Sequence, residues 1–157
     1  RKGVPYMGAV LAMTKGLLPT YIAHLPVNQS FTCEAGRTIW GFPKTVDDID
    51  IDTSGDRLRC VWNKDGLNVL KVSMPMGGSR DFPEQELRTY SYIDGELHET
   101  PFISSSRDLG VRMGGVKMAL GAHPIADELR SLGLPKPALM SLWLGRMTGR
   151  FGAAVRC

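Results

Sequence analysis

The segment Gly36-Arg37-Thr38-Ile39-Trp40-Gly41-Phe42-Pro43-Lys44 places a single lysine at the end of an apolar, aromatic run. Pro43 fixes its own φ angle and restricts Phe42 to extended backbone, so the chain that leads into Lys44 is stiff. A stiff backbone suits a lysine that has to be held in one place. Lys44 is therefore the first candidate functional residue.

Apolar neighbours are one of the environments that make a lysine reactive. An exposed lysine has a pKa of about 10.4, so at pH 7.5 only about one molecule in a thousand carries a neutral amine. Burial or a neighbouring cation lowers such a pKa by several units. A neutral amine attacks a ketone to form a Schiff base, and the protonated imine then draws electrons from a neighbouring bond. The alternative is a lysine that extends from a strand end into solvent.

The same segment resembles the signature of the acetoacetate decarboxylase family, in which the lysine after Phe-Pro forms the Schiff base. The resemblance implies that Lys44 is the catalytic residue. Three neighbours in the segment are candidate substrate-binding residues, namely Arg37, Trp40 and Phe42. Nearly the whole chain is covered, because further similar stretches lie at Pro5-Tyr6, 9–12, Pro26-Val27-Asn28, Glu99-Thr100-Pro101-Phe102, 123–130 and Gly149-Arg150-Phe151-Gly152.

Some positions depart from the family pattern. Family decarboxylases have a second lysine after the first, which helps to lower its pKa, whereas this chain has Thr45. A pocket glutamate of the family is replaced here by Gly8, and an arginine and another glutamate of the family's site lie upstream of Arg1. Because the chain starts without methionine and family members are longer at this end, we expect one domain over 1–157 that lacks an N-terminal segment.

Composition excludes several classes of function. No run of about 18 apolar residues is present, so no membrane span is expected. The net charge is +3, and the basic residues Arg146, Arg150 and Arg156 have no acids near them in the sequence. Without interleaved aromatic and basic residues or a recognised module, nucleic-acid binding is not expected. These arginines are interpreted as a solvated or subunit-facing surface.

The cysteines indicate a reducing compartment. Their number is odd, at three, and they lack metal-ligand spacing, which argues for a cytoplasmic protein without a disulfide scaffold. Cys33 and Cys60 are expected to be small buried hydrophobic residues. His24 has no partner at ligand spacing and is interpreted as a partly buried histidine bonded to backbone. No metal site and no cofactor are predicted.

The pattern of apolar residues predicts many short strands and few helices. A helix is expected from an N-cap at Asn28 or Ser30, with Phe31, Ala35 and Ile39 facing inward, followed by extended chain over 40–46. Asp65-Gly66 and Asp94-Gly95 predict two hairpins. The other expected elements are strands at 9–13, 18–23, 49–53, 57–62, 67–74, 87–92, 96–102, 111–120 and 139–144, and a helix over 123–132 ended by Gly133.

Other candidate positions follow from this pattern. The acids Asp47, Asp48, Asp50 and Asp52 lack the spacing of a calcium loop and predict an edge strand with a solvated acidic face. Glu34 is the nearest upstream carboxylate to Lys44 and is a candidate acid-base partner. Met113 is a candidate lining residue of a pocket, near Gly114-Gly115, where paired glycines in a strand predict a bend, a bulge or a close backbone approach. Trp143 is expected to fill the core.

These elements predict a mainly β fold, α+β by count, with two or three short helices. The resemblance implies a closed, cone-like antiparallel β-barrel that holds the lysine inside. The expected function is a Schiff-base lyase that acts on a small keto acid, most simply by decarboxylating a β-keto acid. Two alternatives stay open: an aldolase or dehydratase with the same imine chemistry, and a barrel that binds a ligand without catalysis. A homo-oligomer is implied by analogy with the family.

Overall fold

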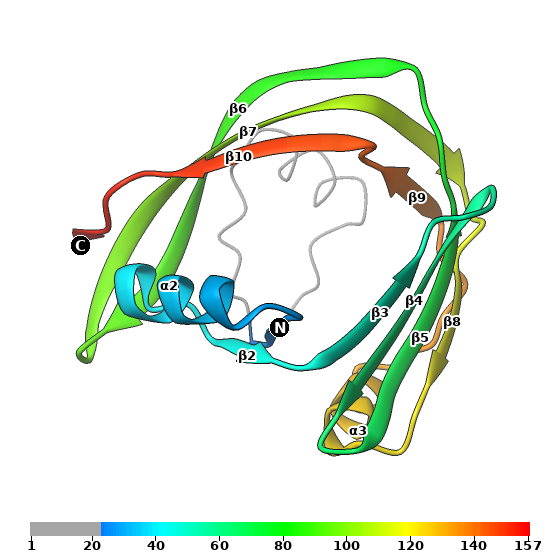
Figure 1. Ribbon diagram of the computed structural model, residues 1–157, viewed down its shortest axis with the longest axis horizontal. Coiled ribbons are helices and arrows are strands. Elements are labelled where there is room, and N and C mark those ends of the chain that lie inside the picture. The colour runs from blue at the N-terminus through cyan, green and yellow to red at the C-terminus, as the bar shows by residue number, and fades with distance from the viewer. Residues whose placement is uncertain (1–22) are drawn as a thin grey trace, which may run out of the picture.

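A computed structural model of the chain describes residues 23–157, which form three β units and two helices (Figure 1). A parallel pair joins β1 (Leu25–Val27) to β2 (Lys44–Val46). A four-stranded antiparallel sheet has the order β3 (Asp48–Asp52), β4 (Arg57–Lys64), β5 (Leu67–Pro75), β8 (Lys117–Leu120). The helices are α2 (Ser30–Trp40) and α3 (Pro124–Ser131). The predicted mainly β fold is therefore confirmed.

A long hairpin organises the remaining strands. It consists of β6 (Arg80–Ile93) and β7 (Glu96–Met113), which pair in antiparallel register. Successive segments of β7 also pair with β11 (Val155–Arg156), β10 (Arg146–Phe151) and β9 (Met140–Trp143). The strands β10 and β11 were not predicted from the sequence. Since β7 contacts all four others, it is the central strand of this five-stranded sheet.

Both predicted hairpin turns are present. Asp65 and Gly66 have φ angles of 50° and 76°, and Asp94 and Gly95 have 52° and 81°. Positive φ at both central residues is the geometry that matches the twist of the flanking strands. The bend at Gly114-Gly115 also occurs, with φ angles of 65° and 82°, but it divides the single strand predicted over 111–120 into the end of β7 and β8.

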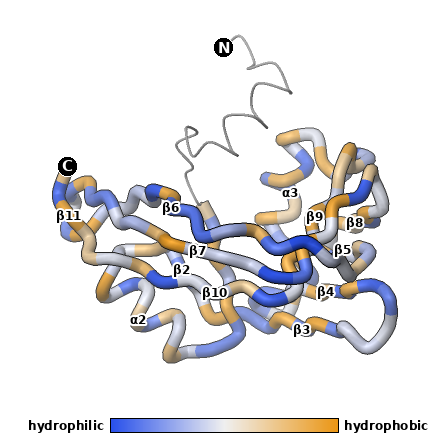
Figure 2. Tube along the Cα trace, turned by 90° about the horizontal axis from the view of Figure 1, so that it is seen from above, coloured by the Kyte–Doolittle hydropathy of each residue, from blue (hydrophilic) through white to orange (hydrophobic). Residues whose placement is uncertain are grey.

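The sheets do not close into the predicted barrel. Among the described residues β3 pairs only with β4 and β8 only with β5, so no ladder connects the four-stranded sheet to the sheet around β7. The parallel pair β1–β2 is a further departure from an all-antiparallel fold. Closure needs an unbroken series of strand partners, and the charged strand β3 resists pairing along its free edge. Figure 2 shows its alternation of hydrophilic Asp and hydrophobic Ile positions.

The helix α2 packs on a different face from the predicted one. Phe31 and Ile39 are exposed, whereas Cys33 and Gly36 are buried. The N-cap is Gln29, which differs from both predicted caps. Small residues on the buried face let the helix lie close to β2, and larger apolar side chains would hold the two apart. The apolar spacing of the sequence therefore gave the helix but not its orientation.

The helix α3 and the core beneath it agree with the sequence pattern. The His123 imidazole accepts a hydrogen bond from the Ile125 backbone N–H and caps the helix, and Gly133 follows it with a φ angle of 83°. Ile125 packs with Trp62 and Val69 in the buried cluster of the four-stranded sheet.

Trp143, predicted to fill the core, is only half-buried. The strands predicted at 9–13 and 18–23 lie almost wholly outside the described residues.

Gly41 ends α2 in the left-handed conformation, with a φ angle of 62°, and a Cβ atom there would collide with the Tyr92 backbone carbonyl. We expect Gly41→Ala to lower the free energy of unfolding by about 3 kcal/mol, because left-handed strain and a clash with backbone add. Urea denaturation of the wild type and of Gly41→Ala measures the difference in the free energy of unfolding.

Gly66→Ala is the matched control for that substitution. Its φ angle is 76°, but nothing lies within 4 Å of the added Cβ, so it carries only the strain, about 1 kcal/mol. Equal losses in the two variants would contradict the close approach at Gly41.

No helix in the described part of the chain is both long and apolar enough to cross a membrane.

Candidate active site around Lys44

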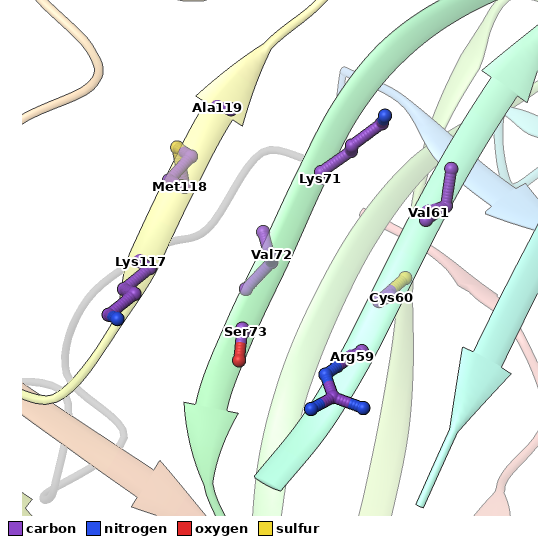
Figure 3. A pocket seen from close by; sticks show the side chains of 9 residues that line it. All are labelled: Arg59, Cys60, Val61, Lys71, Val72, Ser73, Lys117, Met118 and Ala119. Carbon is purple, nitrogen blue, oxygen red and sulfur yellow. The ribbon is translucent and has the colours of Figure 1, made fainter.

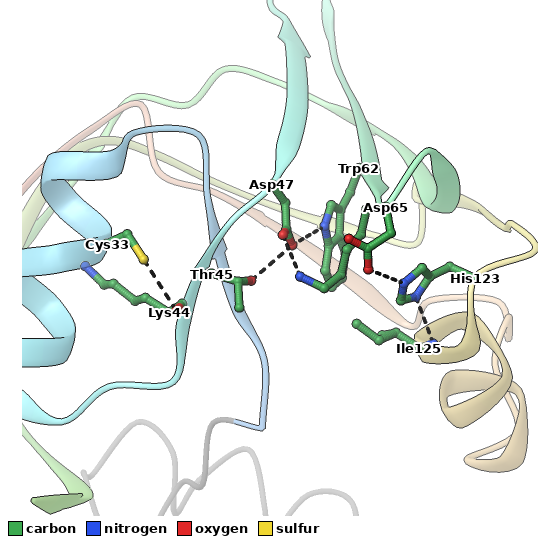
Figure 4. Close-up of polar contacts among 9 residues, drawn as sticks. Cys33, Lys44, Thr45, Asp47, Trp62, Asp65, His123 and Ile125 are labelled. Carbon is green, nitrogen blue, oxygen red and sulfur yellow. Dashed lines mark hydrogen bonds and ion pairs between the residues drawn. The ribbon is translucent and has the colours of Figure 1, made fainter.

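Lys44 is the first residue of β2, and its side chain lies along α2 (Figure 4). The Lys44 Nζ donates a hydrogen bond of 3.0 Å to the Thr32 backbone carbonyl. The Cys33 Sγ lies 3.4 Å from the Lys44 backbone carbonyl and donates to it. The lysine is half-buried. Its amine therefore has a fixed location against the helix.

The end of α2 explains why Lys44 returns along the helix. The Gly41 N–H bonds to the Arg37 carbonyl and the Phe42 N–H to the Gly36 carbonyl, each at 3.1 Å, and Gly41 has the left-handed conformation of an αL C-cap. This reverses the chain within two residues. Pro43 then keeps it extended into β2, so Lys44 lies beside the preceding turns of α2. The stiff approach predicted from the sequence agrees with this path.

Trp40 and Phe42 lie in an aromatic cluster with Phe102 of β7 and Phe151 of β10. The Phe151 ring centroid is 5.1 Å from those of Trp40 and Phe42 and 4.5 Å from that of Phe102. Phe42 is 5% exposed. The Trp40 Nε1 donates to the Gly152 carbonyl at 3.0 Å. The cluster places an apolar wall next to the turn that precedes Lys44.

Phe102 and Phe151 were not among the site residues predicted from the sequence. Both belong to stretches that resemble the family, and this resemblance was the signal that could have identified them. Their position beside Trp40 depends on the register of β10 with β7, in which Phe151 pairs with Phe102. That register joins segments far apart in the chain, and the local pattern does not specify it.

The other predicted site residues are not brought to Lys44 by any hydrogen bond or ion pair among the described residues. Arg37 and Glu34 are exposed on α2. Met113 is 83% exposed at the end of β7 and pairs with Met140 of β9, a strand that lies across the fold from α2 (Figure 1). Roles for these three residues in substrate binding or proton transfer stay predictions.

Asp47 is buried, which corrects its assignment to a solvated acidic face. Its side chain is 2% exposed and accepts hydrogen bonds from the Lys64 Nζ at 2.7 Å, the Trp62 Nε1 at 2.8 Å and the Thr45 Oγ1 at 3.1 Å (Figure 4). Burial raises the pKa of the Asp47 carboxyl, but the bonds from Lys64, Trp62 and Thr45 outweigh it and hold that pKa below its ordinary value. Asp48 and Asp50 are exposed as expected.

Thr45 occupies the position where the family pattern has a second lysine. Its hydroxyl bonds to Asp47, whereas the Lys44 side chain lies against α2. Successive side chains of a strand point to opposite sides, so residue 45 faces away from Lys44. Through Asp47, the Thr45 hydroxyl is linked to the Lys64 ammonium.

Two hollows lie on the four-stranded sheet. One, of about 460 Å³, is bordered by Asp47, Lys64 and Asp65, and is mainly polar. The other, of about 290 Å³, lies over β4, β5 and β8 beside Cys60, with Arg59, Lys71 and Lys117 at its border (Figure 3). Neither is lined by Lys44. Among residues 23–157 no group of three His, Cys, Asp or Glu side chains is arranged to hold a metal ion.

Burial, together with the charge of Asp50, raises the pKa of the Cys60 thiol. Since the thiolate is the reactive form, we expect Cys60 to react with a maleimide at pH 7 at least about tenfold more slowly than the exposed Cys157. Mass spectrometry of the labelled peptides gives both rates, with urea-unfolded protein as the control in which the difference should vanish. Equal rates in folded protein would show that Cys60 is accessible.

His24 and the C-terminal arginines, for which the sequence shows no nearby acid, are paired with acids in the fold. The His24 side chain, predicted to bond to backbone, lies 2.9 Å from the Glu128 carboxylate. The C-terminal arginines pair with acids on the long hairpin: Arg146 with Asp108 at 3.3 Å, Arg150 with Glu84 at 3.3 Å and Arg156 with Glu96 at 2.9 Å. All are exposed pairs, which contribute little to stability. The absence of nearby acids in the sequence did not mean an absence of nearby acids in the fold.

Comparison with known proteins gives the family. The family model described as acetoacetate decarboxylase (ADC) matches residues 7–155. The acetoacetate decarboxylase of Legionella pneumophila subsp. pneumophila str. Philadelphia 1 superposes with a TM-score of 0.56 at 16% identity, over 84% of this chain and 57% of that one. An acetoacetate decarboxylase-like enzyme from Sphingomonas wittichii RW1 gives 0.51 at 18% identity, over 86% and 61%.

No curated protein sequence matched the chain. The chain spans 57% and 61% of the length of those two solved structures, and at such identities the likeness concerns the fold. The family model, in contrast, covers nearly the whole sequence, including the segment that ends at Lys44. This chain belongs to the acetoacetate decarboxylase family.

Proposed function

We propose that the protein is a Schiff-base lyase that acts on a small keto acid through an imine on Lys44. The observation that carries the proposal is the placement of Lys44: the family's Phe-Pro-Lys lysine is held against α2, directly after an aromatic cluster that contains Trp40 and Phe42. The amine is anchored on α2 at the Thr32 carbonyl, and an apolar wall borders the turn that leads to the lysine. The simplest substrate is a β-keto acid similar to acetoacetate.

The reaction begins when the neutral Lys44 amine attacks the ketone carbon and forms a C–N bond. The resulting carbinolamine loses water to give a protonated imine. The bond between the α-carbon and the carboxylate then breaks, carbon dioxide leaves, and the electron pair moves to the iminium nitrogen to form an enamine. Protonation of the enamine carbon and hydrolysis of the imine release the ketone and restore the amine. No step requires a metal or cofactor.

A Schiff-base aldolase or dehydratase is the second candidate. It uses the same iminium but does not require groups that bind a substrate carboxylate. The favouring observation is Thr45, whose hydroxyl is engaged with Asp47, so the second lysine of the family pattern has no counterpart there. A ligand-binding domain without catalysis is the remaining alternative. We further propose a homo-oligomer, by analogy with the family, and a cytoplasmic location, from the odd number of cysteines without metal-ligand spacing.

Borohydride trapping tests the proposal. Folded protein is incubated with a panel of β-keto and α-keto acids, reduced with borohydride, and examined by intact mass and peptide mapping. A stable adduct on Lys44 supports the imine, and release of carbon dioxide or of an aldehyde then separates decarboxylase from aldolase. Absence of an adduct with every ketone would overturn the proposal and favour the ligand-binding alternative.

A further inference from the structure

We infer that Gly36 is a positioning residue for Lys44: it leaves the space along α2 that the lysine side chain occupies. The effect of Gly36 on the reaction rests on the proposed function. The packing of the Lys44 side chain against Gly36 does not depend on it. The proposed role of Lys44 concerns its amine, whereas the inference concerns the groups that determine where that amine lies. It adds a residue of α2 that acts on the reaction without contacting substrate.

The geometry at Gly36 is close. A Cβ atom built on Gly36 would lie 2.5 Å from the Lys44 Cδ, 2.7 Å from its Cε and 2.9 Å from its Nζ. Real Cβ atoms do not approach other heavy atoms so closely, so any larger residue would displace the last three atoms of the lysine. Gly36 is itself buried. The lysine thus occupies the volume that a side chain at position 36 would fill.

The amine extends past Gly36 to reach its hydrogen-bond acceptor. The Lys44 Nζ lies 3.0 Å from the carbonyl of Thr32, which is one turn before Gly36 on α2. Residues four apart lie on the same side of a helix, so Gly36 and Thr32 form one track beneath the lysine. Displacement at Gly36 would therefore also separate the amine from Thr32. The two contacts together fix both the path of the side chain and its end.

Glycine is a poor residue for the interior of a helix, and alanine is the best. Helix propensity alone would therefore favour alanine at position 36. The atoms that an alanine would meet belong to the flexible end of a long side chain, so Lys44 can move aside and the fold survives. This separates a positioning role from a structural one: Gly36→Ala should leave the fold intact and misplace the amine.

The first experiment measures borohydride-trapped adduct formation against ketone concentration in the wild type and in Gly36→Ala. We expect the maximal trapping rate constant to fall at least about tenfold, because the amine no longer lies where it attacks, and the half-saturating ketone concentration to change less than about threefold. Gly55→Ala is the matched control, since nothing lies within 4 Å of its added Cβ. An unchanged maximal rate in folded Gly36→Ala would overturn the inference.

The second experiment does not depend on activity. Melting temperatures are compared among the wild type, Gly36→Ala, Lys44→Ala and the double variant. If the lysine fills the space at position 36, Gly36→Ala should raise the melting temperature more in the Lys44→Ala background than in the wild type, where the lysine must move. Additive effects would overturn the inference even if Gly36→Ala alone proved unstable.

Together the two experiments separate the hypotheses. If the wild type forms no adduct but the melting temperatures show coupling between positions 36 and 44, the Schiff base is rejected and the packing of Lys44 against Gly36 is supported. An adduct in the wild type and in Gly36→Ala at equal rates would keep the Schiff base and reject the positioning role.

Discussion

Replacing Lys44 with arginine is expected to abolish the borohydride-trapped adduct and, with it, turnover of any keto substrate. Arginine keeps the positive charge and most of the length of lysine, but its guanidinium does not deprotonate at ordinary pH and forms no imine. If the imine is obligatory, the loss should reach the detection limit of the assay. Removing a group that forms a covalent intermediate is the largest single effect expected for this protein.

Lys71→Arg provides the control for Lys44→Arg. Lys71 is exposed on β5, at the border of the hollow over the four-stranded sheet and away from the residues that contact Lys44. This variant should trap and turn over substrate at the wild-type rate. If Lys44→Arg still forms an adduct and peptide mapping places it on another lysine, that lysine and not Lys44 is the nucleophile. Retained ligand affinity without turnover in either protein would favour the ligand-binding domain.

Replacing Asp47 with asparagine is expected to lower the free energy of unfolding by about 3 kcal/mol, the low end of the cost of breaking a buried ion pair. The substitution keeps the size of the side chain but leaves the Lys64 ammonium without its counter-charge. The Lys64 side chain is 22% exposed, so it recovers part of its hydration by turning outward. Urea denaturation at pH 7 measures the loss.

The effect of Asp47 should depend on pH in a defined direction. Its carboxyl has a lowered pKa in the folded protein, and an unfolded aspartate has a pKa of about 3.9. The folded state therefore binds its proton less readily, and the stabilisation is complete above the unfolded pKa. It is lost as the pH falls through the folded pKa. The difference between wild type and Asp47→Asn should be constant from about pH 5.5 to 8 and shrink below about pH 4.

Asp48→Asn is the control for the change of charge. Asp48 is exposed at the start of β3 and accepts a hydrogen bond from the Asn63 side chain. Its replacement should alter stability by less than about 0.5 kcal/mol, as is usual for surface positions. A loss in Asp48→Asn as large as that in Asp47→Asn would mean that general acidity of this strand, and not the buried pair with Lys64, stabilises the fold.

The sequence by itself determined the local features. Asp-Gly pairs specify turns because those residues tolerate positive φ angles, and both hairpins followed. The prediction of α3 with its following glycine depended on residues adjacent in the chain. The Phe-Pro-Lys segment gave the family and Lys44, because that signature is contiguous.

Tertiary structure decided everything that depends on segments far apart in the chain. The register of β10 with β7 put Phe151 beside Trp40, and the pairing of β3 with β4 brought Trp62 and Lys64 to Asp47. The open sheets were decided by which strands found partners, which no single strand encodes. The buried face of α2 carries Cys33 and Gly36, and the Lys44 side chain lies beside it, which the apolar spacing of the helix does not predict. Local propensity acts over a few residues, whereas packing and pairing sum interactions across the whole fold.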